Sequence, residues 1–181
     1  MSDPYDLKAH IRSVKDYPIA GVEFRDITSL LETPTAFKTA CNAMTSICRD
    51  FRPTTVVAIE SRGFIFAGPM AYELSLPFVL ARKPGKLPNP AFSRSFDLEY
   101  GSTSLEVQKN TLIGSQDRVV IVDDLIATGG TAMGCAELLN EDFGVPKENI
   151  LVAALIDLPA LKGSAAIDAA GYEARSIVAY D

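Results

Sequence analysis

A short stretch in the middle of the chain holds the residues that most clearly suggest chemistry. Two adjacent carboxylates, Asp123 and Asp124, follow the apolar run 119–122, and the loop 128–131 consists only of threonine and glycine. Glycine lets the backbone of such a loop turn several N–H groups toward one anion, and the threonine hydroxyls add donors. Apolar residues recur at helical spacing over residues 132–143, so a helix N-terminus would face the same anion. The sequence therefore predicts a phosphate-monoester site between a buried strand and a helix.

The carboxylate pair needs a different ligand, because two negative charges would repel a phosphate that they faced directly. Asp123 and Asp124 are expected instead to accept hydrogen bonds from neighbouring sugar hydroxyls, or to face a metal ion. A phosphate loop beside a reader of sugar hydroxyls describes a site for ribose 5-phosphate. The alternative is an ordinary buried strand that ends in a turn before a helix.

Composition limits the class of protein. The chain has 181 residues, 48% of them hydrophobic, which predicts one α/β domain with a full core. A net charge of −6 without a block of lysine or arginine argues against nucleic acid or a membrane surface as partner. Three cysteines without metal-ligand spacing, no signal peptide and no run of membrane-spanning length predict a cytoplasmic protein.

Strand and helix patterns alternate along the chain. Buried strands are expected at residues 56–60, 78–81, 119–122, 150–156 and 176–180. Helices are expected near the N-terminus, where Leu7, Ile11 and Val14 have helical spacing, from Thr33-Pro34 onward, over residues 64–74 and after residue 131. The alternation predicts a doubly wound, mostly parallel sheet.

Ligands of such sheets bind beyond the carboxyl ends of the strands. Four polar loops, 60–63, 82–86, 123–131 and 157–163, follow predicted strands and would open at that edge. A long loop and an alternating segment, residues 96–108, predict a hairpin that turns near Tyr100 and Gly101. Such an insertion between core strands is typical of a lid over a site.

The run VVIVDDLIATGGTA resembles the phosphoribosyl pyrophosphate (PRPP) signature of type I phosphoribosyltransferases. Further stretches resemble the adenine phosphoribosyltransferase family in its order and over most of the chain: GVEFRDIT, ESRGFIFAGP, ARKPGKLP, DLEYG and DLPALKG. The resemblance implies a single domain, residues 1–181, with a small hood from about residues 1–33 and a flexible lid hairpin. It also implies a homodimer that converts adenine and PRPP to AMP and pyrophosphate in purine salvage. Mg²⁺ is the implied cofactor, bound through PRPP and water and not directly by side chains.

The same resemblance assigns roles to residues by position. Ribose and 5′-phosphate would contact Asp123, Asp124, Ala127, Thr128, Gly129, Gly130 and Thr131. Pyrophosphate would contact Ser61, Arg62 and Gly63, together with Arg82, Lys83 and Lys86, which are expected to act across the dimer interface. Adenine would lie between Phe24 and Leu158, with backbone groups of Glu23 and Arg25 at the base edge. Glu99, beside Tyr100 in the lid, would exchange a proton with purine N7, and Arg62 would assist catalysis.

Two other functions stay open. A phosphoribosyltransferase for hypoxanthine, guanine or xanthine would need donors for a 6-oxo group, and Lys162 is the only cation in the loop after Leu158. A non-catalytic regulator that senses PRPP or nucleotides would usually carry a DNA-binding module or a basic face, and neither is evident. Glu23 stands where relatives usually have an apolar residue, so a packing role for this side chain would put base specificity in doubt.

Overall fold

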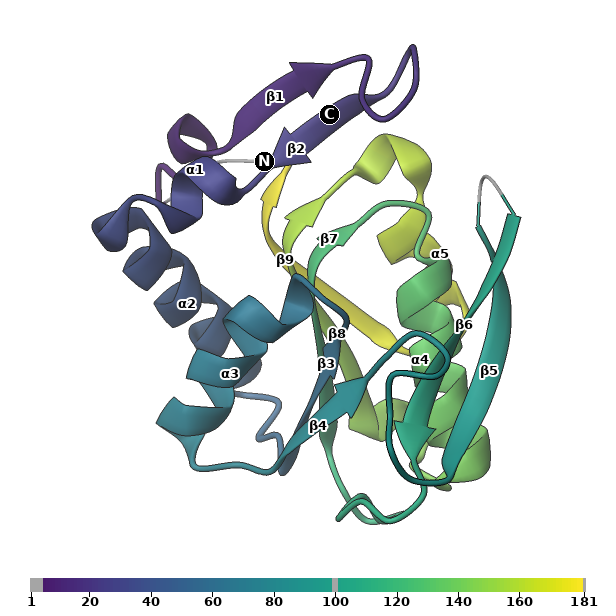
Figure 1. Ribbon diagram of the computed structural model, residues 1–181. Helices are drawn as coiled ribbons and strands as arrows, with labels where there is room; N and C mark the ends of the chain where they lie inside the picture. Colours follow the sequence, from purple (N-terminus) through teal and green to yellow (C-terminus); the bar gives the residue numbers. More distant parts are fainter. Residues whose placement is uncertain (1–4, 99–100, 181) are drawn as a thin grey trace.

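Five parallel strands form the central sheet in the spatial order β4-β3-β7-β8-β9 (Figure 1). The computed structural model describes residues 5–98 and 101–180. The sheet strands are Thr55–Ile59 (β3), Phe78–Ala81 (β4), Val119–Ile126 (β7), Ile150–Asp157 (β8) and Glu173–Ala179 (β9). The prediction of a doubly wound parallel sheet is confirmed.

Helices cover both faces of this sheet (Figure 1). One layer holds α1 (Thr28–Leu31), α2 (Pro34–Cys48) and α3 (Gly63–Leu74), and the other holds α4 (Gly130–Asp142) and α5 (Gly163–Ala169). Short 3₁₀ turns lie at Lys8–His10 (η1), Lys147–Asn149 (η2) and Pro159–Leu161 (η3). Within the described residues, no helix combines the length and the apolar character needed to cross a membrane.

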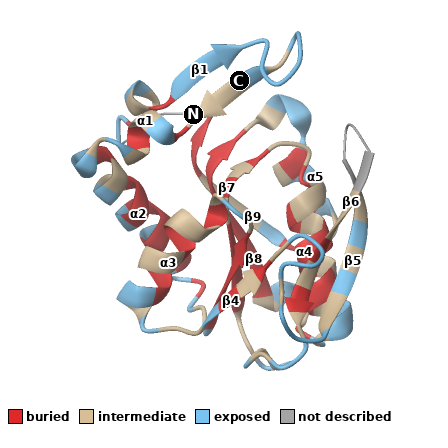
Figure 2. Ribbon diagram, viewed as in Figure 1, coloured by how far each residue is buried: buried red, intermediate tan, exposed pale blue. Residues whose placement is uncertain are grey.

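The strands are apolar on both faces because successive side chains point to opposite helical layers. Val120 and Val122 pack into the core beside α2 and α3, whereas Val119 and Ile121 pack into the core beside α4. All four side chains are fully buried, and Figure 2 shows buried residues concentrated in the middle of the sheet. This two-sided burial explains why the run 119–122 is uninterrupted by polar residues.

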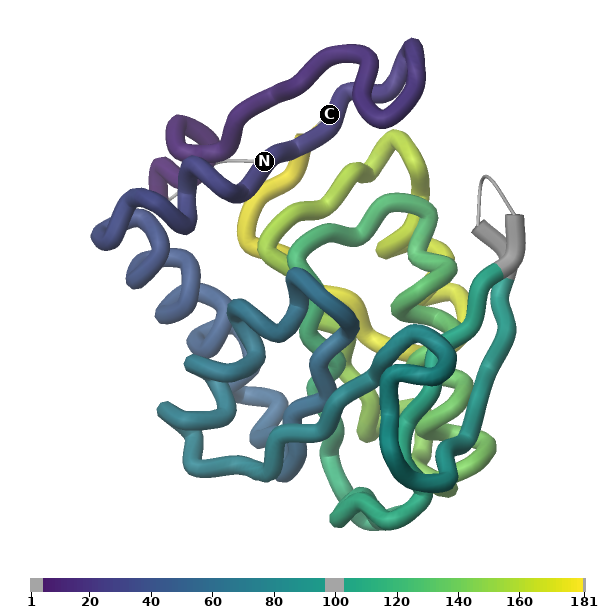
Figure 3. Tube along the Cα trace, viewed as in Figure 1, coloured from purple at the N-terminus to yellow at the C-terminus, as the bar shows by residue number. Residues whose placement is uncertain are grey.

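The N-terminal prediction of a helix is wrong. Among the described residues 5–20 only η1 is helical, and the chain continues as an antiparallel ribbon of β1 (Arg12–Lys15) and β2 (Glu23–Asp26). Leu7 and Ile11 are buried, whereas Val14 is 39% exposed and lies opposite Phe24 in the ribbon. Pairing with β2 satisfies the backbone of β1, so tertiary contact overrides the helical spacing. Figure 3 shows this ribbon beside the C-terminal end of the chain.

The central strand is longer than the sequence suggested. We expected Asp123 and Asp124 to close it, but β7 continues to Ile126 because β8 pairs alongside, with Asp123 opposite Ala154 and Leu125 opposite Ile156. Adjacent residues of a strand point to opposite faces. The side chains of Asp123 and Asp124 therefore point to opposite faces of the sheet.

The predicted hairpin is confirmed as β5 (Ala91–Leu98) and β6 (Gly101–Gln108), although it begins before residue 96. It lies against α4, where the rings of Phe92 and Phe143 meet edge to face with centroids 5.1 Å apart. Glu99 and Tyr100, the expected lid residues, lie outside the described residues.

The buried central strand generates a prediction about stability. Ile121→Ala should lower the free energy of unfolding by ~2–5 kcal/mol, because it removes fully buried methyl groups and leaves a cavity. Ile121→Val should cost only ~0.5–1.5 kcal/mol. Urea denaturation of the two variants measures both values. Equal and negligible losses would mean that Ile121 is not packed in the core.

Candidate active site

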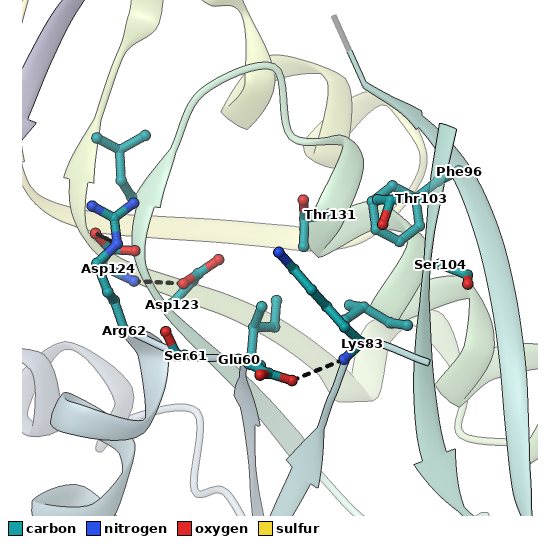
Figure 4. Close-up of a pocket in the computed structure, with 13 residues that line it drawn as sticks. Glu60, Ser61, Arg62, Lys83, Phe96, Thr103, Ser104, Asp123, Asp124 and Thr131 are labelled. Atoms are coloured by element: carbon teal, nitrogen blue, oxygen red, sulfur yellow. Dashed lines mark hydrogen bonds and ion pairs between the residues drawn. The ribbon is translucent and has the colours of Figure 1, made fainter. Parts of the chain in front are cut away.

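A cavity of about 280 Å³ opens at the carboxyl ends of β3 and β7 (Figure 4). It is lined by Ile59, Glu60, Ser61, Arg62, Lys83, Phe96, Thr103, Ser104, Leu105, Asp123, Asp124, Leu125 and Thr131. The residues come from the end of β3, the turn before α3, the loop after β4, the hairpin, the end of β7 and the start of α4. The structure thus brings together the predicted carboxylate pair, Ser61, Arg62, Lys83 and Thr131.

The turn between β3 and α3 is held by residues that follow β4. Glu60 accepts two hydrogen bonds from the guanidinium of Arg82, both at 3.2 Å, and one from the backbone N–H of Lys83 at 3.0 Å. These bonds hold the pKa of Glu60 below its ordinary value, the Arg82 bond being the main cause. The peptide bond between Glu60 and Ser61 is cis. Arg82 is therefore committed to Glu60, whereas the side chain of Lys83 points into the cavity (Figure 4).

Close packing brings Arg62 to the carboxylates. A Cβ at Gly63 would lie 2.4 Å from the carbonyl oxygen of Val122, so only glycine lets α3 begin this close to β7. The Nε of Arg62 then lies 3.1 Å from Oδ2 of Asp124, and its guanidinium carbon lies 5.3 Å from the ring centroid of Phe24. Arg62 therefore spans the distance between the central strand and the N-terminal ribbon.

The two carboxylates differ in surroundings. Asp124 is only 3% exposed and has Arg62 as its ion-pair partner, whereas Asp123 accepts the backbone N–H of Asp124 at 2.9 Å and lines the cavity. Burial raises the pKa of Asp123 well above its ordinary value, and the negative charge of Asp124 adds to the shift. Burial also raises the pKa of Asp124, and Arg62 opposes this. The pair is thus an electrostatically costly arrangement that groups donating hydrogen bonds would relieve.

The glycine-threonine loop forms its own concavity. A cavity of about 110 Å³ is lined by Asp123, Leu125, Ile126, Ala127, Thr128, Gly129, Gly130, Thr131 and Ala132. Gly129 has φ +82° immediately before α4, and the first turn of α4 contains no acidic residue. The loop therefore offers backbone N–H groups and a helix N-terminus without a carboxylate of that turn to repel an anion.

The predicted base-binding residues are less closely gathered. Phe24 is half-buried on β2, with its ring 5.1 Å from that of Tyr17, and it lines a separate hollow of the ribbon. Leu158 is half-buried after β8, and its N–H donates to the carbonyl of Ile126 at 3.0 Å. Within the described residues, neither side chain lines the main cavity. Arg62 is the residue that links Phe24 to it.

The two residues flanking Phe24 lie on the other face of the ribbon. Glu23 and Arg25 form an ion pair with two contacts of 3.0 and 3.1 Å. The guanidinium carbon of Arg25 lies 4.0 Å from the ring centroid of Tyr180. The carboxylate of Glu23 is thus engaged by Arg25.

Sequence reasoning missed several residues at the site. Phe96, Thr103 and Ser104 reach the cavity from the hairpin, and Glu60 organises the turn. The alternating pattern of residues 96–108 predicted a hairpin, but it did not predict which face of the hairpin packs against α4. Lys86 is exposed, and its backbone carbonyl accepts a hydrogen bond from Arg82 at 3.2 Å.

Comparison with known proteins agrees with this geometry. Residues 26–163 match the family model described as the phosphoribosyl transferase domain. An adenine phosphoribosyltransferase of Haemophilus ducreyi is 45% identical over 97% of this chain and 96% of its own length. One from Carboxydothermus hydrogenoformans is 49% identical over 87% of this chain and 91% of its own.

Solved structures give the same answer. The crystal structure of adenine phosphoribosyltransferase from Thermoanaerobacter pseudethanolicus has a TM-score of 0.87 at 38% identity, covering 97% of this chain and 98% of that one. APRTase from Giardia lamblia, complexed with 9-deazaadenine, has a TM-score of 0.91 at 37% identity and covers 100% and 99%. The fold and site thus define a phosphoribosyltransferase of type I. Within that class, the chain belongs to the adenine phosphoribosyltransferase family.

The carboxylate pair generates a prediction about how stability depends on pH. Because the pKa of Asp123 is raised in the folded protein, this carboxyl group lowers the free energy of unfolding as the pH rises from the ordinary aspartate pKa to the raised one. Asp123→Asn should therefore be more stable than the wild type at pH 7, and the gain should vanish below the ordinary aspartate pKa of about 3.9. Chemical denaturation across this range measures the difference.

A matched control is Asp168→Asn. Asp168 is exposed and, like Asp123, accepts one backbone N–H, that of Ala174 at 3.0 Å. It should give no comparable gain, because its charge is solvated. A less stable Asp123→Asn variant at neutral pH would contradict the electrostatic account of the pair.

Proposed function

We propose that this protein transfers the phosphoribosyl group of PRPP to N9 of adenine, producing AMP and pyrophosphate in purine salvage. The observation that carries the proposal is the meeting of three features at one sheet edge: the carboxylate pair Asp123-Asp124, the cation Arg62 and the anion-binding loop 127–131. Membership of the adenine phosphoribosyltransferase family supports the choice of reaction.

The loop 127–131 takes the 5′-phosphate, because its glycines and the N-terminus of α4 present donors to an anion. Asp123 and Asp124 take the ribose hydroxyls, since ionised carboxylates are acceptors only and a diol supplies two donors. The two groups lie at opposite ends of the same strand-to-helix connection, as a ribose 5-phosphate requires. This arrangement fixes C1′ of the sugar near the main cavity.

Pyrophosphate is assigned to the turn after β3. Ser61 lines the cavity, Gly63 follows at the start of α3, and Arg62 and Lys83 supply positive charge. Binding of pyrophosphate would compete with Asp124 for Arg62, whose side chain is 42% exposed. Arg62 thereby stabilises the charge that develops on the leaving group.

Mg²⁺ fits this donor set only as an ion shared with PRPP. Among the described residues, no group of three or more His, Cys, Asp or Glu side chains could hold a metal ion. Mg²⁺ commonly keeps several waters and binds through one or two carboxylates together with substrate phosphates. Asp123 and Asp124 would accept hydrogen bonds from those waters, and the bound ion would neutralise charge on the leaving pyrophosphate.

Adenine is assigned to the space between the ribbon β1–β2 and the loop after β8. The ribbon belongs to the proposed hood, about residues 1–33, and the hood and sheet form one domain of residues 1–181. Phe24 and Leu158 provide the apolar faces, and backbone groups of Glu23 and Arg25 read the base edge. The ion pair of Glu23 with Arg25 supports a backbone role for Glu23.

A homodimer completes the proposal. Edge strand β4 pairs with one neighbour in the central sheet. Phe78, the first residue of β4, is 42% exposed, and Leu112, which lines the same surface hollow, is 81% exposed. Such apolar exposure at a sheet edge supports a protein partner. Lys86 would reach a partner's pyrophosphate, and Arg82 would act through Glu60. A cytoplasmic location also remains a prediction, supported by three free, buried cysteines.

Catalysis is assigned to the lid. Glu99 would take the proton from purine N7 as N9 attacks C1′, with Tyr100 beside it, and closure would exclude water that hydrolyses PRPP. Phe96 and Thr103 on the same hairpin line the cavity, which supports the assignment of the lid to this hairpin.

The first prediction from this proposal concerns base choice. With PRPP and Mg²⁺, adenine should be converted to AMP, and hypoxanthine and guanine should have kcat/KM lower by ~10²-fold or more, because a 6-oxo group would meet acceptors. A spectrophotometric assay with each base in turn measures this ratio. Comparable turnover of hypoxanthine would favour a 6-oxopurine enzyme, and no turnover of any base would favour a PRPP-sensing regulator.

The second prediction concerns Glu99. Glu99→Gln should keep PRPP affinity and stability and lose ~10²–10⁴-fold in kcat, the value of a proton-transfer group. Glu99→Leu should lose more, since it cannot hydrogen-bond N7. Single-turnover formation of AMP at saturating substrates isolates this step from product release. Wild-type rates in both variants would assign the proton to water or another group.

A further inference from the structure

Two glycines from different loops touch beneath the anion-binding loop. Gly163 is buried at the start of α5, and Gly129 lies just before α4. A Cβ at Gly163 would lie 2.2 Å from the carbonyl oxygen of Ala127 and 2.7 Å from the N of Gly129. A Cβ at Gly129 would lie 2.9 Å from the carbonyl oxygen of Gly163. The backbones therefore pack directly against each other, with room for hydrogen only.

This contact joins two loops that serve opposite ends of a nucleotide. Gly129 belongs to the loop 127–131, which lines the smaller cavity. Gly163 ends the segment that begins at Leu158, whose N–H donates to the carbonyl of Ile126 at 3.0 Å. The segment 158–163 thus contacts the end of β7 through its first residue and the anion-binding loop through its last residue.

We propose that Gly163 is a positioning residue for the 5′-phosphate loop, and that the Gly129–Gly163 contact fixes the distance between that loop and Leu158. The inference rests on the proposed function, which places phosphate in the loop and the base on Leu158. It goes beyond that function because Gly163 touches neither the phosphate nor the base in the proposal.

The physical reason is the crowding at the backbone of the loop. Ordinary van der Waals contact begins near 3.4 Å, so a methyl group at position 163 would push Ala127 and Gly129 away by about 1 Å. The N–H groups that converge on an anion would then no longer point to one centre. A displacement of about 1 Å in a positioning element can cost ~10²-fold in activity.

Gly163→Ala tests the proposal, with Gly68→Ala as its matched control. Gly68 is also a helical glycine, but a Cβ there meets nothing within 4 Å. Calorimetry should measure binding of ribose 5-phosphate and of inorganic pyrophosphate to each protein. We expect Gly163→Ala to lose ribose 5-phosphate affinity by ~10²-fold and keep pyrophosphate affinity, because the pyrophosphate turn lies on another strand end. Gly68→Ala should keep both.

A general loss of structure would lower both affinities together, and equal affinity of Gly163→Ala and wild type for ribose 5-phosphate would overturn the proposal. Failure of the wild type to bind ribose 5-phosphate would overturn the proposed function and this inference with it. If Gly163→Ala does not fold, hydrogen exchange of the wild type decides. Ribose 5-phosphate carries no base, so it should protect residues 159–163 together with 127–131, and pyrophosphate should not. Protection of 127–131 alone would overturn the coupling.

Discussion

The parallel pairing of β3 with β7 is the constraint on which the rest of the site depends. It sets Ala58 beside Val122, so the turn that follows β3 begins next to the carboxylate pair of β7. Gly63 then lets α3 start against the carbonyl of Val122, and Arg62 reaches Asp124 as a consequence. Glu60, held by Arg82, keeps the same turn in place from the other side. A shift of one residue in this register would separate the cation from the carboxylates.

The negative charges of the carboxylate pair favour the binding of a ligand that donates hydrogen bonds. Asp123 and Asp124 are adjacent, burial raises the pKa of both, and Arg62 forms an ion pair only with Asp124. The fold accepts this cost because Val119–Val122 and the strands on either side bury apolar surface on both faces. Ribose hydroxyls and a magnesium-bound water shell would supply the missing donors. The carboxylate pair lowers the stability of the unliganded protein, and a ligand that donates hydrogen bonds to it would restore that stability on binding. A sugar phosphate has such donors in its hydroxyl groups, whereas an isolated anion has none.

Much of this arrangement was predictable from the sequence. The uninterrupted apolar runs indicated strands buried on both faces, and the loop 128–131 indicated an anion site. The N-terminal helix was wrong because Val14 pairs across a ribbon, a contact that local spacing does not encode. The end of β7 was misplaced because β8 pairs beyond Asp123. The role of Glu60 and the contact of Gly163 with Gly129 were missed, since both join residues distant in the chain and neither changes the local pattern.

The most direct test of the account is a crystal structure of the protein with AMP. The account predicts the 5′-phosphate in the loop 127–131, the ribose hydroxyls within hydrogen-bonding distance of Asp123 and Asp124, and adenine between Phe24 and Leu158. AMP bound away from the carboxyl ends of β3 and β7, or bound there with its ribose turned from both carboxylates, would contradict it.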